Sequence, residues 1–233
     1  MDSYLKHYIN GKWVDSIGGK RHEVISPSTE EPCTEITLGT QADVDAAVSA
    51  ARQAFKTFSQ TSREERIALM NRIIEEYKKR IPDFAKSMAA EMGAPVSFAT
   101  MAQAPAGLGG FLGTLPALEN FAFKEQHGAN TVVYEPIGVV GLITPWNWPL
   151  NQIALKVAPC IAAGNTMVLK PSEECPGNAA IFAEVMDAAG VPPGVFNLVQ
   201  GDGPTVGNAI SAHPDVDMVS FTGSTRAGIL VAK

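Results

Sequence analysis

The spacing of apolar positions changes along the chain and divides it into regions with different expected elements. Near the N-terminus, short apolar runs flank Asn10-Gly11, a dipeptide typical of two-residue hairpin turns because both turn residues need a positive φ. Between residues 40 and 93, apolar residues recur every three or four positions, which predicts amphipathic helices. Thr40 and Ser62 are each followed three residues later by an acidic residue, which is the spacing of a capping box at a helix start.

From residue 130 onward, short apolar runs alternate with helical patterns. We expect strands at residues 131–134, 139–143, 166–170, 195–199 and 218–221, with helices between the later strands. Apolar strands joined by helical crossovers predict a parallel sheet that is covered on both faces. The predicted fold class is therefore α/β, a parallel sheet with helices on both faces that follows an N-terminal β-hairpin region.

Two further stretches bear on burial and on membranes. Residues 104–118 form the most apolar segment and carry several Gly and Pro residues, so we expect packed interior there. Residues 1–8 lack a basic stretch followed by an apolar one, so no signal peptide is expected. No apolar run reaches the roughly 18 residues that a transmembrane helix needs, so none is predicted.

The composition argues against two classes of partner. The chain has 233 residues, 45% of them hydrophobic, with 18 Lys and Arg against 24 Asp and Glu. At roughly 150 residues per domain, this length suggests one large or two small domains. A net charge of −6 without a Lys/Arg cluster argues against nucleic acid or an anionic membrane as the main partner.

The cysteines and histidines suggest neither a disulfide framework nor a metal site. Cys33, Cys160 and Cys175 have no C-x-x-C spacing, and the four histidines form no H-x-x-x-H pair. A reducing, cytoplasmic location is therefore expected. Cys160 falls on the apolar side of a predicted helix, and Cys175 follows two glutamates that would raise the pKa of its thiol, so all three cysteines are interpreted as structural.

Candidate chemistry lies in four loops that follow the predicted parallel strands, because ligands of open α/β sheets bind beyond the carboxyl ends of the strands. These loops are residues 144–149, 171–174, 201–205 and 222–225. Thr222-Gly223-Ser224 opens a helix and would suit a pyrophosphate, although Gly-Ser is also an ordinary helix cap. Residues 201–207 read G-x-G-x-x-x-G, one residue longer than the dinucleotide fingerprint, and are weak evidence alone.

Three polar side chains in these loops have two possible interpretations each. Glu173 follows a strand that ends at Lys170, and the two could hydrogen-bond ribose hydroxyls or form a solvated loop ion pair. Asn147 lies in a rigid loop between two tryptophans and two prolines, where its amide could stabilise an oxyanion or satisfy its own turn.

Taken together, the motifs are more specific than any one of them. Residues 135–150 (EPIGVVGLITPWNWPL), 163–173, 190–197, 201–207 and 221–225 resemble, in the same order, the motifs of the aldehyde dehydrogenase superfamily. The resemblance covers essentially the whole chain, including the hairpin at Asn10-Gly11, and corresponds to the N-terminal, cofactor-binding half of that superfamily. It implies a Rossmann-like parallel sheet with a protruding β-arm.

The resemblance also implies residue roles. Asn147 would be the side-chain half of the oxyanion hole, and the cofactor would be NAD, favoured over NADP by Glu173 without excluding NADP. The Lys170–Glu173 pair would hold the adenosine ribose, and Gly223 and Ser224 would contact the pyrophosphate. The implied cofactor-binding residues are Ile143, Thr144, Pro145, Trp146, Lys170, Ser172, Glu173, Gly203, Gly207, Phe221, Gly223 and Ser224.

The implied organisation has three parts. Residues 1–115 would be the N-terminal part of the NAD-binding domain, and residues 137–233 would be the Rossmann-like part of the same domain. Residues 116–136 would be part of an oligomerisation β-arm. The full-length protein would be a homodimer or homotetramer that oxidises a small-molecule aldehyde to a carboxylic acid.

The superfamily's nucleophilic cysteine and its general-base glutamate lie beyond the segment that matches residues 221–225. The segments that carry this cysteine and this glutamate are not present in the sequence, so the 233-residue chain alone is expected to be inactive. Two alternatives stay open. The chain could be a non-catalytic dinucleotide-binding or oligomerisation module, or part of an acylating or semialdehyde-specific relative.

Overall fold

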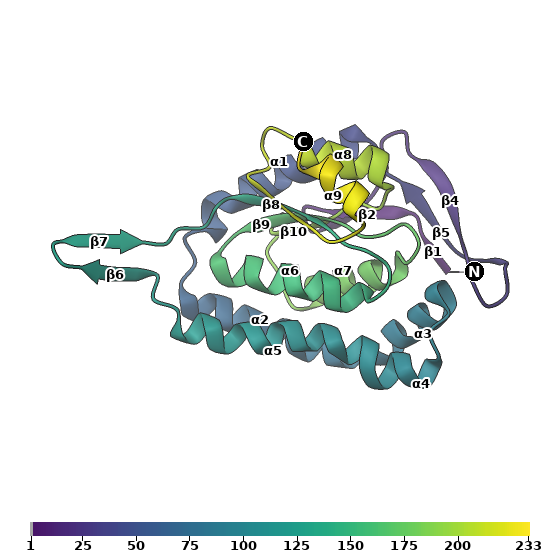
Figure 1. Ribbon diagram of the computed structural model, residues 1–233, viewed down its shortest axis with the longest axis horizontal. Coiled ribbons are helices and arrows are strands. Elements are labelled where there is room, and N and C mark those ends of the chain that lie inside the picture. The colour runs from purple at the N-terminus through teal and green to yellow at the C-terminus, as the bar shows by residue number, and fades with distance from the viewer. Residues whose placement is uncertain (1) are drawn as a thin grey trace.

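The computed structural model describes residues 2–233, so Met1, the first residue of the predicted region 1–115, lies outside the described residues. Its centre is a six-stranded sheet with the order β11-β8-β9-β10-β2-β3 (Figure 1). The parallel strands are β8 (Val139–Ile143), β9 (Thr166–Lys170), β10 (Phe196–Leu198) and β11 (Met218–Phe221). The predicted α/β fold with a parallel sheet is therefore confirmed.

An N-terminal hairpin extends this sheet. It consists of β2 (Lys6–Ile9) and β3 (Lys12–Asp15), and β2 joins β10 in antiparallel orientation through Tyr8 and Leu198. Asn10 and Gly11 have φ values of 52° and 73°, as the predicted two-residue turn requires. The hairpin is thus part of the main sheet. A separate three-stranded sheet is formed by β1 (Asp2–Tyr4), β5 (Pro32–Leu38) and β4 (Lys20–Ile25).

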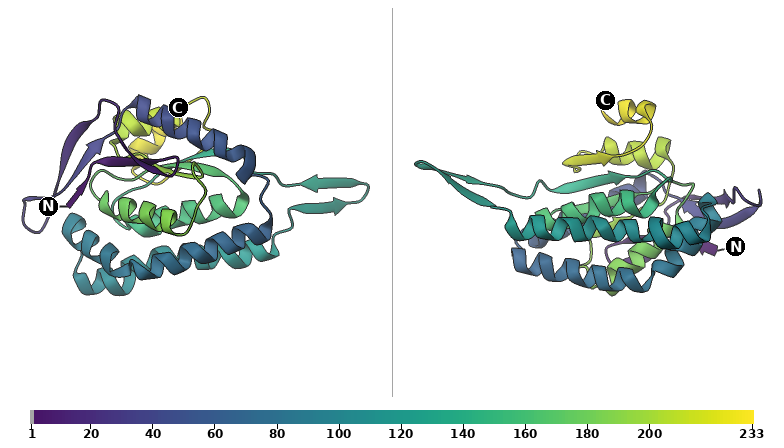
Figure 2. Two further views of the ribbon diagram at one scale, coloured as in Figure 1. Left: turned by 180° about the vertical axis from the view of Figure 1, so that it is seen from behind. Right: turned by 60° about the horizontal axis from the view of Figure 1, so that its bottom comes forward.

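Helices cover both faces of the main sheet (Figures 1 and 2). On one face lie α6 (Pro149–Ala163) and α7 (Gly177–Ala188), and outside them α2 (Arg63–Lys79), α3 (Ile81–Met92) and α5 (Ala104–Asn120). On the other lie α1 (Gln41–Phe58) and α8 (Asn208–Ser211). Because successive strand residues point to opposite faces, Val140 and Leu142 join the larger apolar core and Val139 the smaller one.

Local signals place the ends of several helices. Ser62 accepts the N–H of Glu65 at 3.1 Å while the Glu65 carboxylate accepts the N–H of Ser62 at 2.7 Å, which completes the predicted capping box. The Asp43 carboxylate likewise accepts the N–H of Thr40 at 2.9 Å. Gly164 ends α6 in the left-handed conformation with φ 81°.

The segment 104–118 differs from its prediction as packed interior. It is the helix α5, which continues from α4 (Val96–Phe98) and the π-helical turn η1 (Ala99–Gln103). Gly110 faces α6 so closely that a Cβ there would lie 3.0 Å from the carbonyl carbon of Ala154. The opposite side of the helix is open, and Leu112 is 50% exposed. Only one face of this apolar segment is therefore interior.

A two-stranded hairpin of β6 (Lys124–His127) and β7 (Asn130–Val133) protrudes from the body (Figures 1 and 2). The predicted arm begins at residue 116, but residues 116–120 belong to α5, because Leu118 remains in the apolar core. None of the helices in residues 2–233 combines the length and the apolar character that crossing a membrane requires.

Candidate functional site

The loops after the four parallel strands meet at one edge of the sheet. The N–H of Thr144 donates to the carbonyl of Lys170 at 3.1 Å, and the N–H of Thr222 donates to the carbonyl of Ile143 at 3.0 Å. The N–H of Val199 donates to the carbonyl of Leu169 at 3.0 Å. These bonds continue the strand pairing into the loops. The loops that carry the predicted candidate residues therefore begin at neighbouring strand ends.

A cleft of about 360 Å³ opens at this edge, between the turn η2 (Gly203–Gly207) and the last helix α9 (Thr225–Val231). It brings together five of the predicted cofactor-binding residues, which come from two strand ends and two of the loops: Ile143, Gly203, Gly207, Phe221 and Ser224. The remaining lining residues are Pro204, Asn208, Arg226, Ala227, Leu230 and Val231. The cleft has an apolar lining with a few polar and charged groups, as small-molecule sites usually do.

The glycines on the η2 side leave room in the cleft. A Cβ on Gly203 would meet no atom within 4 Å, and one on Gly207 would make only ordinary contacts at 3.8 Å, one of them with the side chain of Lys170. The Asp202 carboxylate accepts the N–H of Thr205 at 2.7 Å and so fixes the start of this turn. Gly203 and Gly207 thus leave open space on the η2 side of the cleft.

On the opposite side, Phe221 and the start of α9 are fitted to each other. A Cβ on Gly223 would lie 2.5 Å from the Phe221 ring, so any larger residue there would have to displace this ring. Gly223 is exposed and does not line the cleft. The Ser224 hydroxyl accepts the N–H of Ala227 at 3.2 Å, so Ser224 is a helix cap as well as a lining residue. A pyrophosphate contact for Gly223 and Ser224 stays a prediction.

Lys170 is buried, with only 2% of its surface exposed. Its Nζ donates to the carbonyls of Pro171 and Gly201 and to Oε2 of Glu173, at 3.2 Å for the last. Burial lowers the pKa of Lys170, and the carboxylates of Glu173 and Asp202 oppose this effect. The interpretation as a solvated loop ion pair is therefore wrong for Lys170. Its three N–H groups all have protein acceptors, so its main effect is to hold Glu173 and the Gly201 loop in place.

The Asn147 loop lies outside the cleft. Thr144 is buried, whereas Trp146 and Asn147 are exposed and Pro145 is half-buried. The carbonyl of Asn147 accepts a hydrogen bond from Nε2 of Gln103 at 3.4 Å. In residues 2–233 the Asn147 side-chain amide has no hydrogen-bond partner, so its predicted alternative role in its own turn is not observed.

One further contact is found in the loop of Asn147 and one in the loop after Lys170. Trp148, next to Asn147, packs edge-to-face against Phe98 of α4 with ring centroids 5.8 Å apart. Ser172 accepts the N–H of Glu174 at 3.3 Å and so stabilises its own turn. The cofactor roles of Thr144, Pro145, Trp146 and Ser172, and the oxyanion role of Asn147, stay predictions.

Sequence reasoning missed the contribution of α9. Ala227, Leu230 and Val231 form one apolar side of this helix and line the cleft together with Arg226. The signal was present, because positions 227, 230 and 231 have the spacing of an amphipathic helix. Asn208 was also missed, although it directly follows the G-x-G-x-x-x-G segment.

None of the cysteines has the environment of a reactive thiol. Burial raises the pKa of Cys160 to about 12 and raises that of Cys175 well above its usual value, and burial raises the pKa of Cys33 as well. The carboxylate near Cys175 is Glu91 of α3, whereas the sequence pointed to the adjacent glutamates. In the part of the chain that the structure describes, no group of three or more His, Cys, Asp or Glu side chains could hold a metal ion.

Comparison with known proteins gives one consistent result. The sequence model of the aldehyde dehydrogenase family matches residues 13–233. A 3-succinoylsemialdehyde-pyridine dehydrogenase from a Pseudomonas species is 54% identical over 233 residues, which are 100% of this chain and 49% of that protein. The chain thus spans about half the length of the curated relatives it matches.

Solved structures agree with this result. The crystal structure of an aldehyde dehydrogenase from Bartonella henselae has a TM-score of 0.97 at 49% identity and covers 100% of this chain and 50% of its own. A mutant of aldehyde dehydrogenase C from Pseudomonas syringae, in complex with NAD⁺ and octanal, has a TM-score of 0.96 at 48% identity. It covers 98% of this chain and 47% of its own.

Proposed function

Because the chain belongs to the aldehyde dehydrogenase family, we propose that it is the NAD-binding half of an enzyme that oxidises an aldehyde to a carboxylic acid. The observation that carries this proposal is the cleft that unites Ile143, Gly203, Gly207, Phe221 and Ser224 at the carboxyl edge of a parallel sheet. The nucleophile would be supplied by residues outside this chain, since burial raises the thiol pKa of Cys33, Cys160 and Cys175. The family resemblance implies the same for the general base.

The residues around the cleft suit the parts of NAD. Phe221 and Leu230 offer apolar walls for an adenine ring, and Arg226 is a cation for the pyrophosphate. Glu173, 29% exposed and held by Lys170, would accept hydrogen bonds from ribose hydroxyls. A carboxylate at this position repels a 2′-phosphate, which favours NAD over NADP. The NAD⁺ in the Pseudomonas syringae complex supports the choice of cofactor.

Asn147 would stabilise the oxyanion that forms when a nucleophile attacks the aldehyde carbonyl. Its side-chain amide is exposed, while its backbone is held by Gln103 and its neighbour Trp148 by Phe98. Bound NAD would supply the hydride acceptor. The loop would therefore contribute a prepositioned hydrogen-bond donor to the chemistry.

Two finer proposals concern the substrate and the assembly. A semialdehyde substrate is favoured by the name of the Pseudomonas relative, which includes a semialdehyde. A homodimer or homotetramer of the full-length protein is favoured by the protruding hairpin, where Val132 and Val133 are 37% and 56% exposed. We also propose a cytoplasmic location, which three unpaired cysteines favour.

Titration calorimetry with NAD tests the proposal. We expect Gly207→Leu to weaken NAD binding at least tenfold, because the new side chain projects into the cleft from a position with no steric conflict. The matched control is Gly109→Leu, on the exposed side of α5, where a Cβ meets no atom within 4 Å. Equal NAD affinity of the two variants would contradict the proposal.

A further inference from the structure

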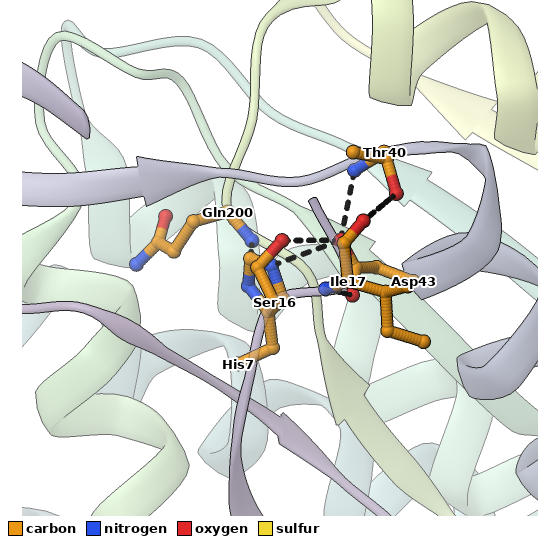
Figure 3. A network of polar contacts seen from close by, with 6 residues as sticks. All are labelled: His7, Ser16, Ile17, Thr40, Asp43 and Gln200. Atoms are coloured by element: carbon orange, nitrogen blue, oxygen red, sulfur yellow. Dashed lines mark hydrogen bonds and ion pairs between the residues drawn. The ribbon is translucent and has the colours of Figure 1, made fainter. Parts of the chain in front are cut away.

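His7 lies in the middle of β2 and is completely buried. Its Nδ1 accepts the backbone N–H of Gln200 at 3.2 Å, so the ring proton is on Nε2. Nε2 faces the Asp43 carboxylate of α1, 3.5 Å away (Figure 3). The ring therefore connects the first helix with the segment that follows β10.

Gln200 is held at three points. Besides the bond to His7, its carbonyl accepts the N–H of Gly39 at 2.8 Å, and its Nε2 donates to the carbonyl of Pro176 at 3.2 Å. Two of these contacts fix the backbone and the third fixes the side chain. Gln200 is consequently the anchor of the loop that leads into η2.

The next residues of this loop form the cofactor side of the site. The carbonyl of Gly201 accepts a hydrogen bond from Nζ of Lys170 at 2.8 Å, and Gly203 lines the cleft. Gly201 is packed tightly against Val206, because a Cβ on Gly201 would lie 2.2 Å from the Val206 side chain. A displacement of Gln200 would therefore move the acceptor of Lys170 and the wall of the cleft together.

We propose that His7 is a positioning residue for the cofactor: as the neutral ring it anchors Gln200 and thereby sets the place of Gly201, Lys170 and Gly203. This inference rests on the proposed NAD-binding function of the cleft. A protonated ring carries N–H groups on both nitrogens and has no acceptor for the Gln200 N–H. Protonation of His7 would thus release the loop and weaken NAD binding.

The surroundings of His7 define how it titrates. Burial lowers its pKa, and the Asp43 carboxylate from α1 opposes this effect. The neighbouring strand β10 has no titratable side chain, and the residue of β3 that pairs with His7 is Val14. Because the folded state favours the neutral ring, the contact with Gln200 is intact at neutral pH and is lost only as the pH falls through the folded-state pKa of His7, which lies below the ordinary value of 6.5.

Two substitutions distinguish the effect of the hydrogen-bond acceptor of His7 from the effect of its protonation. His7→Asn keeps an acceptor and cannot be protonated, whereas His7→Phe keeps a ring and has no acceptor. We expect the dissociation constant for NAD of the folded, unmodified chain to rise about fivefold once the pH, lowered from about 7.5, passes the folded-state pKa of His7. His7→Asn removes most of this rise, and His7→Phe weakens NAD binding about tenfold already at about pH 7.5. The control is His22→Asn, in the separate three-stranded sheet.

Hydrogen exchange of the Gln200 amide gives a second readout that does not depend on NAD. We expect its protection to be lost in folded His7→Phe and kept in His7→Asn. Unchanged protection of Gln200 in folded His7→Phe would overturn the inference, and so would a full pH dependence of NAD binding in His7→Asn. If the unmodified chain fails to bind NAD, the proposed function is wrong, and the exchange of Gln200 still decides whether His7 anchors the loop.

Discussion

Two buried carboxyl groups each accept backbone N–H groups from another part of the chain, and they differ in their charge. Asp43 of α1 accepts hydrogen bonds from the Ser16 hydroxyl at 2.6 Å and from the N–H groups of Ile17 and Thr40 at 2.8 and 2.9 Å (Figure 3). Burial alone would raise its pKa, but these bonds and His7 lower it overall. Asp43 is therefore ionised in the folded protein.

Glu91 of α3 also accepts hydrogen bonds from other residues, but the distances are longer than those at Asp43. Both of its carboxylate oxygens accept the single N–H of Gly177, at 3.1 Å each, and the Ser87 hydroxyl is 3.3 Å away. Burial outweighs these contacts and raises the pKa of Glu91 to about 7. The comparison teaches that the balance between burial and the hydrogen bonds donated to a carboxyl group decides whether it is charged.

The largest effect is expected at Asp43. Asp43→Ala leaves the donors of Ser16, Ile17 and Thr40 without their acceptor, and we expect the free energy of unfolding in urea to fall by roughly 3 kcal/mol or more. The control is Asp45→Ala on the same helix, whose side chain is 55% exposed and whose removal should change stability by less than about 0.5 kcal/mol. Similar losses in the two variants would mean that the network around Asp43 contributes little.

The next effect is the pH dependence that Glu91 introduces. Because folding raises its pKa, the protonated form is stabilised, and this contribution is complete below the unfolded value of 4.5 and is lost as the pH rises through about 7. We expect Glu91→Gln to gain roughly 3 kcal/mol relative to the unmodified chain over this pH interval, as measured by urea unfolding at several pH values. A stability difference that stays constant across this interval would show that Glu91 does not titrate there.

Asp43 and Glu91 also show where sequence reasoning succeeds and where it ends. The capping role of Asp43 could be predicted, because it depends on a residue three positions away. The bond between Glu91 and Gly177 joins residues 86 positions apart and has no local signal. For the same reason, the raised pKa of Cys175 was predicted in direction but assigned to the wrong glutamates.

The cleft and its surroundings also contain features that sequence reasoning can predict and features that it cannot. Ile143, Gly203, Gly207, Phe221 and Ser224 could be placed together, because parallel strands bring their carboxyl ends to one edge. The pairing of β2 with β10 could not, since it joins Tyr8 to Leu198 across most of the chain. The one-sided burial of residues 104–118 was also hidden, because an evenly apolar helix does not reveal which face meets α6.

The most direct test of the central claim, that the strand-end cleft binds NAD, is amide hydrogen exchange of the 233-residue chain with and without saturating NAD. We predict that NAD slows exchange in η2 (Gly203–Gly207) and at the start of α9 (Thr225–Val231), on the two sides of the cleft, and leaves the β6–β7 hairpin unchanged. Protection confined to segments away from the cleft, or none at all from a folded chain, would contradict the account.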